Sequence, residues 1–71
     1  MADSVYKVIE LVGTSEESWE KAAKTAVETA SKTLRGLRIA EVKKLDMHLD
    51  DDKILTYRAR IKVSFKVEEE D

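Results

Sequence analysis

The sequence has no cysteine and a single histidine, His48, which removes two of the usual means of stabilising a small protein. Without cysteine no disulfide forms, and without a group of cysteine and histidine residues there is no structural zinc site. At 71 residues, the chain is near the lower limit at which burial of apolar surface stabilises a fold by itself. Oligomerisation is the remaining source of stability, so we expect the chain to assemble with copies of itself.

The sequence also has no large excess of charge of either sign. Charged residues make up 39% of the chain, but the formal net charge is only -2, so the whole chain does not attract nucleic acid or an anionic membrane. No apolar run approaches the roughly 18 residues of a membrane-spanning helix, and residues 1–4 lack the basic and apolar regions of a signal peptide. We therefore expect a cytoplasmic protein without nucleic-acid or membrane partners.

Glycine is present only at positions 13 and 36, so there is no glycine-rich loop to bind phosphate. The sequence also lacks a nucleophile paired with a base and the spacing of a metal triad. These absences favour a binding protein over an enzyme.

The first half of the chain predicts a strand followed by a long helix. Residues 5–12 (VYKVIELV) are short and rich in β-branched side chains, and Gly13 closes them, as in a strand that ends in a turn. Residues 14–17 (TSEE) match a capping box, which predicts the start of a helix. We expect this helix to run for about six turns to a C-terminal cap at Gly36, because apolar residues recur at three- and four-residue spacing. These residues, which are expected to pack in the core, are Trp19, Ala22, Ala23, Ala26, Val27, Ala30, Leu34 and Leu37.

The second half of the chain predicts two further strands. Residues 39–49 alternate imperfectly, because the apolar phase changes near residues 43–44, which indicates a β-bulge. The aspartates of residues 50–53 supply a turn. Residues 55–67 alternate strictly between apolar and polar, the period-two pattern of a strand with one buried face. The acidic residues 68–71 are expected to be solvated and frayed.

Together these elements predict an α+β fold of β-α-β-β order. A helical crossover leaves the first two strands parallel with a gap between them, and the third strand returns antiparallel into that gap, in the order 1-3-2. The expected fold is therefore a three-stranded antiparallel sheet packed on one long helix, as a single domain over residues 1–71.

The sheet face turned away from this helix is expected to be basic. Aromatic side chains of the last strand point to the other face, so base stacking on the basic face has no support. We expect the cations to pair with Glu10 and Glu41 of the same or neighbouring subunits. A nucleic-acid module is the alternative, and strongly salt-dependent oligonucleotide binding would support it. The cations are Arg58, Arg60, Lys62 and Lys66.

Three consecutive aspartates at the predicted turn offer hard oxygen ligands to a divalent cation. Asp50 and Asp52 are the candidate calcium ligands, particularly if symmetry brings several copies together. The pattern of a calcium loop between paired helices is absent, because no glycine occupies the sharp turn and no glutamate closes the loop. The alternative is a solvated turn.

Two segments, VYKVIELVGTSEESWEKAAKTAVETASKTLRGLRIAEVKKL and TYRARIKVSF, resemble the dodecin family over nearly the whole chain. The VYKVIELVGTSEES opening is the most specific part. The resemblance implies twelve copies assembled into a hollow homododecamer, with flavins held in pairs in pockets between subunits. It therefore implies the binding and storage of a small-molecule ligand.

The resemblance also assigns two cofactor-binding positions, Ile39 and Arg58. In flavin-binding dodecins, a tryptophan at the first position stacks on the flavin, and a glutamine at the second hydrogen-bonds its polar edge. Isoleucine has no π-face, and arginine has donors only, although it suits a phosphate or another anionic ligand. Flavin (FMN or riboflavin) is thus the family expectation, weakened at both positions. Calcium binding is associated with family members that lack the tryptophan, so a calcium-binding shell without flavin is the second hypothesis.

Overall fold

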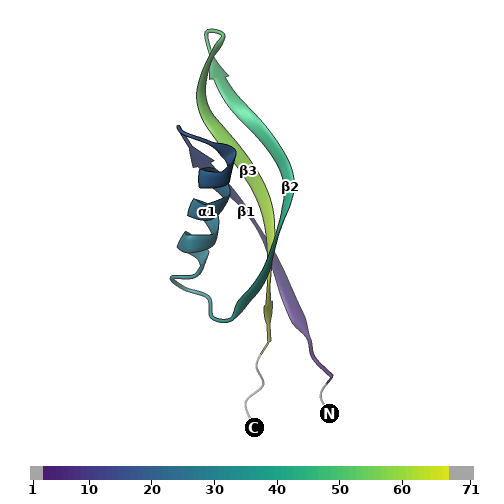
Figure 1. Cartoon of the computed structure of the whole chain (residues 1–71). Helices are drawn as coiled ribbons and strands as arrows, with labels where there is room; N and C mark the ends of the chain where they lie inside the picture. Colours follow the sequence, from purple (N-terminus) through teal and green to yellow (C-terminus); the bar gives the residue numbers. More distant parts are fainter. Residues whose placement is uncertain (1–2, 68–71) are drawn as a thin grey trace.

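The computed structural model describes residues 3–67, which form one helix and one sheet (Figure 1). The elements are strand β1 (Tyr6–Ser15), helix α1 (Trp19–Ala30), strand β2 (Leu37–Asp50) and strand β3 (Lys53–Lys66). Strand β3 lies between β1 and β2 and is antiparallel to both, so the strand order is β1-β3-β2. The predicted α+β class, element order and sheet topology are confirmed. The acidic residues 68–71 lie outside the described residues.

Strand β3 supplies most of the core because alternate residues in its middle face α1. Ala59, Ile61 and Val63 are at most 1% exposed, and they pack against Ala22 and Ala26 of the helix. Among the described residues, Ile61 and Val63 are the only large side chains with almost no exposure to solvent. The core of one chain is therefore thin.

The prediction that Gly13 ends the first strand is wrong. Gly13 instead allows α1 to approach β1 closely. Strand β1 continues to Ser15. A Cβ atom at Gly13 would overlap the carbonyl oxygen of Ala22 and come within 2.9 Å of the Cβ of Ala26. Glycine in a strand often marks such a close approach, because it has no side chain to separate the two elements.

Helix α1 begins later than predicted. Ser18 is its N-cap, and the hydroxyl of Ser18 accepts a hydrogen bond from the backbone N–H of Lys21 at 3.0 Å. The predicted cap within residues 14–17 is wrong, because Thr14 remains in β1, opposite Arg58. Pairing with the central strand outweighs the local capping pattern in this segment.

Helix α1 also ends earlier than predicted, at Ala30 after 12 residues. Past this point the Ser31 hydroxyl donates to the carbonyl of Glu28 at 2.8 Å, a local contact that competes with continuation of the helix. The prediction of a helix cap at Gly36 is wrong, since Gly36 has φ +70° in the connection that leads into β2. No helix among the described residues has the length and apolar character of a membrane span.

The β2–β3 hairpin projects past α1 and ends in a two-residue turn at Asp51 and Asp52 (Figure 1). Both residues have positive φ, 55° and 64°, as a type I′ turn requires. The protomer measures 55 × 20 × 14 Å and has a radius of gyration of 14.9 Å, whereas a compact chain of this length has about 11 Å. The projecting hairpin leaves apolar side chains uncovered. These are Leu45, Met47, Leu49, Ile54 and Leu55.

Candidate functional site

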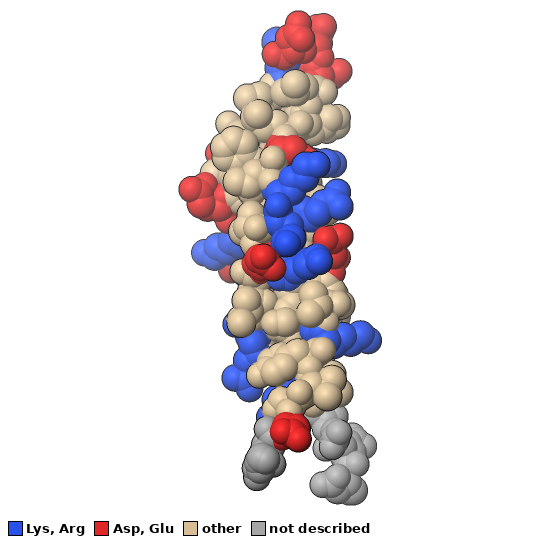
Figure 2. All heavy atoms as spheres, turned by 90° about the vertical axis from the view of Figure 1, so that its right-hand side faces the viewer, with Lys and Arg blue, Asp and Glu red and all other residues tan. Residues whose placement is uncertain are grey.

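The sheet face turned away from α1, which we call the open face, carries the candidate site. Figure 2 shows lysine and arginine side chains gathered about the middle of this face, with largely uncharged surface above and below them. The strand register places a row of β3 cations between residues of both edge strands. The residues at the middle of the open face are Glu10, Val12, Thr14, Glu41, Lys44, Asp46, Arg58, Arg60 and Lys62.

The irregular register of β2 decides which of its side chains reach the open face. The register shifts at three places, residues 37–39, 42–44 and 48–49, and the shift at residues 42–44 confirms the predicted bulge. As a result, Asp46 lies opposite Arg58. Without the shift at residues 48–49, a regular register from the turn would place Asp46 opposite Tyr57, on the other side of the sheet. No pattern in the sequence signals the shift at residues 48–49, so this pairing was not predicted.

Asp46 and Arg58 form the shortest ion pair of the open face. Arg58 Nε donates to Asp46 Oδ1 at 2.7 Å, and Arg58 Nη2 donates to Asp46 Oδ2 at 3.1 Å. The hydrogen bonds from the guanidinium hold the pKa of the Asp46 carboxyl below its ordinary value, and the same contact raises the pKa of Arg58. The bidentate geometry fixes the relative orientation of the two side chains.

Trp19 supports this pair from the helix side of the sheet. Its Nε1 donates to the backbone carbonyl of Asp46 at 3.0 Å. Its ring meets that of Tyr57 edge to face, with centroids 5.1 Å apart and an interplanar angle of 70°. Because Tyr57 directly precedes Arg58, Trp19 holds both strands at the position of the ion pair. The side chain lies at the margin of the core and is only half-buried.

The expected salt bridges of the open face are present in part. Arg60 Nη1 lies 3.7 Å from Glu10 Oε1, as expected, and Lys43 Nζ lies 3.6 Å from Glu41 Oε2. Exposed ion pairs of this length contribute little stability.

Ile39 and Arg58, the predicted cofactor-binding residues, both lie on the open face but far from each other. Ile39 pairs with Ser64, six residues along β3 from Arg58, which corresponds to roughly 20 Å of strand. Ile39 is 66% exposed. One chain therefore does not bring these two residues into one pocket, and a pocket that uses both needs a second copy.

Asp50 and Asp52, the predicted calcium ligands, lie at the exposed tip of the hairpin. Asp50 ends β2 opposite Lys53, and Asp52 belongs to the turn. Within residues 3–67, no group of three or more acidic, histidine or cysteine side chains is arranged to hold a metal ion. A complete calcium site at this tip would need ligands from other copies.

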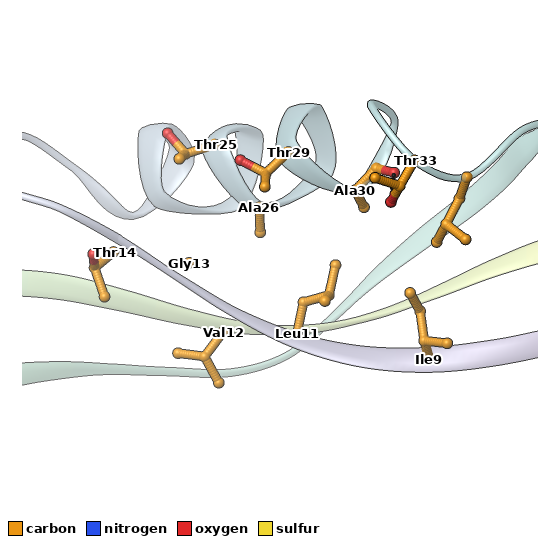
Figure 3. A pocket seen from close by; sticks show the side chains of 11 residues that line it. Ile9, Leu11, Val12, Gly13, Thr14, Thr25, Ala26, Thr29, Ala30 and Thr33 are labelled. Carbon is orange, nitrogen blue, oxygen red and sulfur yellow. Dashed lines mark hydrogen bonds between the residues drawn. The ribbon is translucent and has the colours of Figure 1, made fainter.

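A groove of about 450 Å³ lies on the other side of the sheet, between α1 and β1 (Figure 3). Leu11 points into it from the strand, and Thr25 and Thr29 line it on the helix, whereas Val12 points away. Among residues 3–67, those that line this groove are uncharged, and its polar groups include threonine hydroxyls.

Comparison with known proteins decides the family. The dodecin family model matches residues 5–68. This chain belongs to the dodecin family. It is 47% identical over 64 residues to the calcium dodecin of Mycobacterium tuberculosis, covering 90% of each protein. It is 43% identical over 65 residues to the dodecin of Thermus thermophilus, covering 92% of this chain and 94% of that protein.

Solved dodecin structures share the fold. The dodecin of Streptomyces coelicolor superposes with a TM-score of 0.91 at 34% identity, over 99% of this chain and 100% of that one. The calcium dodecin of M. tuberculosis, a calcium-chelating antigen with a calcium-binding site, gives a TM-score of 0.83 at 44% identity, over 96% and 97%. The resemblance noted in the sequence is confirmed, and dodecins are small ligand-binding proteins.

Proposed function

We propose that this dodecin is a cytoplasmic binding and storage protein, a homododecamer whose ligand lies in pockets between subunits. The separation of Ile39 and Arg58 on the open face carries this proposal, because a ligand that touches both residues has to lie between chains. The thin core supports assembly, since a second chain would cover apolar surface that one chain leaves exposed. The proposed ligand is a flavin, FMN or riboflavin, as in the family.

The pocket should hold flavin more weakly than one that contains tryptophan. Ile39 offers apolar contact but no ring face, and aromatic stacking contributes on the order of 1 kcal/mol beyond the area that it buries. Flavin bound at this site therefore depends more on polar contacts, which this proposal assigns to Arg58 of a neighbouring chain.

Native mass spectrometry of the untreated purified protein tests this proposal, because it gives the number of subunits and the mass of retained ligand together. A dodecamer that carries the mass of flavin supports flavin storage. A dodecamer with metal adducts alone favours the calcium hypothesis below, and a monomer contradicts assembly.

Calcium binding by a closed shell is the second candidate function. It is favoured by the similarity to the M. tuberculosis calcium dodecin and by the exposed aspartates at the hairpin tip. We expect the melting temperature to rise with added calcium and to fall with a chelator. The double variant Asp50→Asn/Asp52→Asn should lose this response, whereas Glu28→Gln, on the exposed side of α1, should keep it. A full calcium response in the double variant would exclude these aspartates as ligands.

A further inference from the structure

Arg58 and Asp46 complement each other in what they can donate and accept. A guanidinium has five N–H donors and no acceptor, whereas a carboxylate has acceptor lone pairs and no donor. Asp46 engages Nε and Nη2 of Arg58. Among the described residues, Nη1 has no hydrogen-bond partner. Free donors of Arg58 thus lie beside free lone pairs of Asp46 on the open face.

The two formal charges cancel within this pair, so the surface that it presents is neutral and has donors next to acceptors. A side-chain carboxamide has the same combination, which arginine alone lacks. Exposed fractions of 41% for the Arg58 side chain and 37% for that of Asp46 leave this edge open to a ligand.

The pair is also fixed in place by contacts that do not use its outward atoms. Trp19 bonds to the backbone carbonyl of Asp46, and its ring contacts Tyr57, the neighbour of Arg58 in β3. Polar groups that are already ordered bind a ligand at a smaller cost in conformational entropy.

We propose that Asp46 determines ligand specificity, and that the Asp46–Arg58 pair binds the edge of a neutral heterocycle in which acceptor and donor atoms alternate. The cyclic imide of an isoalloxazine ring has such an edge. This inference rests on the proposed ligand pocket and adds a residue that distinguishes ligand classes. The negative charge of Asp46 repels an inorganic anion from the remaining donors of Arg58, so the pair disfavours phosphate at this position.

The test uses the assembled full-length protein, with riboflavin as the probe and quenching of its fluorescence as the signal. Ile39→Trp supplies the missing ring face and leaves the ion pair intact. We expect Ile39→Trp to bind riboflavin as tightly as Ile39→Trp/Arg58→Gln does. Adding Asp46→Ala to Ile39→Trp should weaken binding by about tenfold or more, because Arg58 is then left with donors alone. Adding Glu28→Gln, which neutralises an exposed carboxylate on α1, should leave the affinity unchanged.

Competition by inorganic phosphate at constant ionic strength gives a second readout, which a purely structural role of Asp46 would not change. Phosphate should not compete with riboflavin in Ile39→Trp. It should compete once Asp46→Ala has freed Arg58. If the alanine variant does not assemble, Asp46→Asn keeps the shape of the side chain and should show the same gain of phosphate competition.

The outcomes separate this inference from the proposed flavin pocket. Binding by Ile39→Trp/Arg58→Gln but not by Ile39→Trp overturns the role of the ion pair and leaves the pocket standing. Failure of both variants to bind riboflavin overturns the pocket and the inference together. Unchanged riboflavin affinity in the Asp46→Ala variant, or phosphate competition before that change, also overturns the inference.

Discussion

Among single residues, Asp46 makes the open face sensitive to pH. The hydrogen bonds from Arg58 lower the pKa of its carboxyl most, the charges of Arg58, Lys44 and Arg60 add to this, and partial burial opposes it. A carboxyl whose pKa is lower in the folded state favours folding when it is ionised. Its contribution is therefore present above the unfolded-state pKa and is lost as the pH falls through the folded-state pKa.

We expect Asp46→Asn to destabilise the protein at pH 7. This loss of stability should shrink as the pH falls through the lowered folded-state pKa of Asp46, where the native carboxyl becomes protonated as well. Urea denaturation of both proteins at one protein concentration, from neutral to acid pH, measures the difference between their free energies of unfolding. Glu10→Gln serves as the control, since its contact with Arg60 is longer, at 3.7 Å. A difference in free energy of unfolding that is equal at acid and neutral pH would show that the ion pair does not cause it.

Among the elements, the contact between α1 and β1 depends on Gly13. We expect Gly13→Ala to destabilise the protein by about 1–3 kcal/mol, because the added methyl group meets helix backbone that has to shift. Equilibrium denaturation measures this cost. Gly36→Asn is the matched control, since Gly36 has open space around it and asparagine tolerates a positive φ. Equal stability of the two variants would mean that the helix adjusts freely.

The elements themselves were predictable from the sequence, whereas their ends and register were not. The strict alternation of residues 55–67 and the helical spacing after Trp19 predicted the central strand and the helix. The ends depended on competing contacts: pairing with β3 kept Thr14 in β1, and the Ser31 hydroxyl donates to the carbonyl of Glu28 at the end of the helix. Asp46 was missed because a register shift near the turn decides which face it occupies. No local pattern encodes that shift.

For the whole molecule, the charges of the open face should affect association between chains. We expect Arg60→Glu to weaken assembly, on the order of tenfold or more in the concentration required, because the new carboxylate lies beside Glu10. Sedimentation velocity over a dilution series measures the effect. Lys24→Glu changes the net charge equally from an exposed position on α1, so it controls for charge alone. Unchanged sedimentation of Arg60→Glu would place this part of the open face outside the subunit contacts.

The alanine-lined contact between α1 and the sheet has a consequence for how the chain acquires its structure. Alanine and glycine allow close approach but bury little area per residue, so a single chain gains little free energy by folding alone. In the proposed oligomer, contacts between copies would supply much of the driving force, so we expect folding and assembly to form one equilibrium. The midpoint temperature of unfolding should then rise with protein concentration. Dilution alone should favour the unfolded chain.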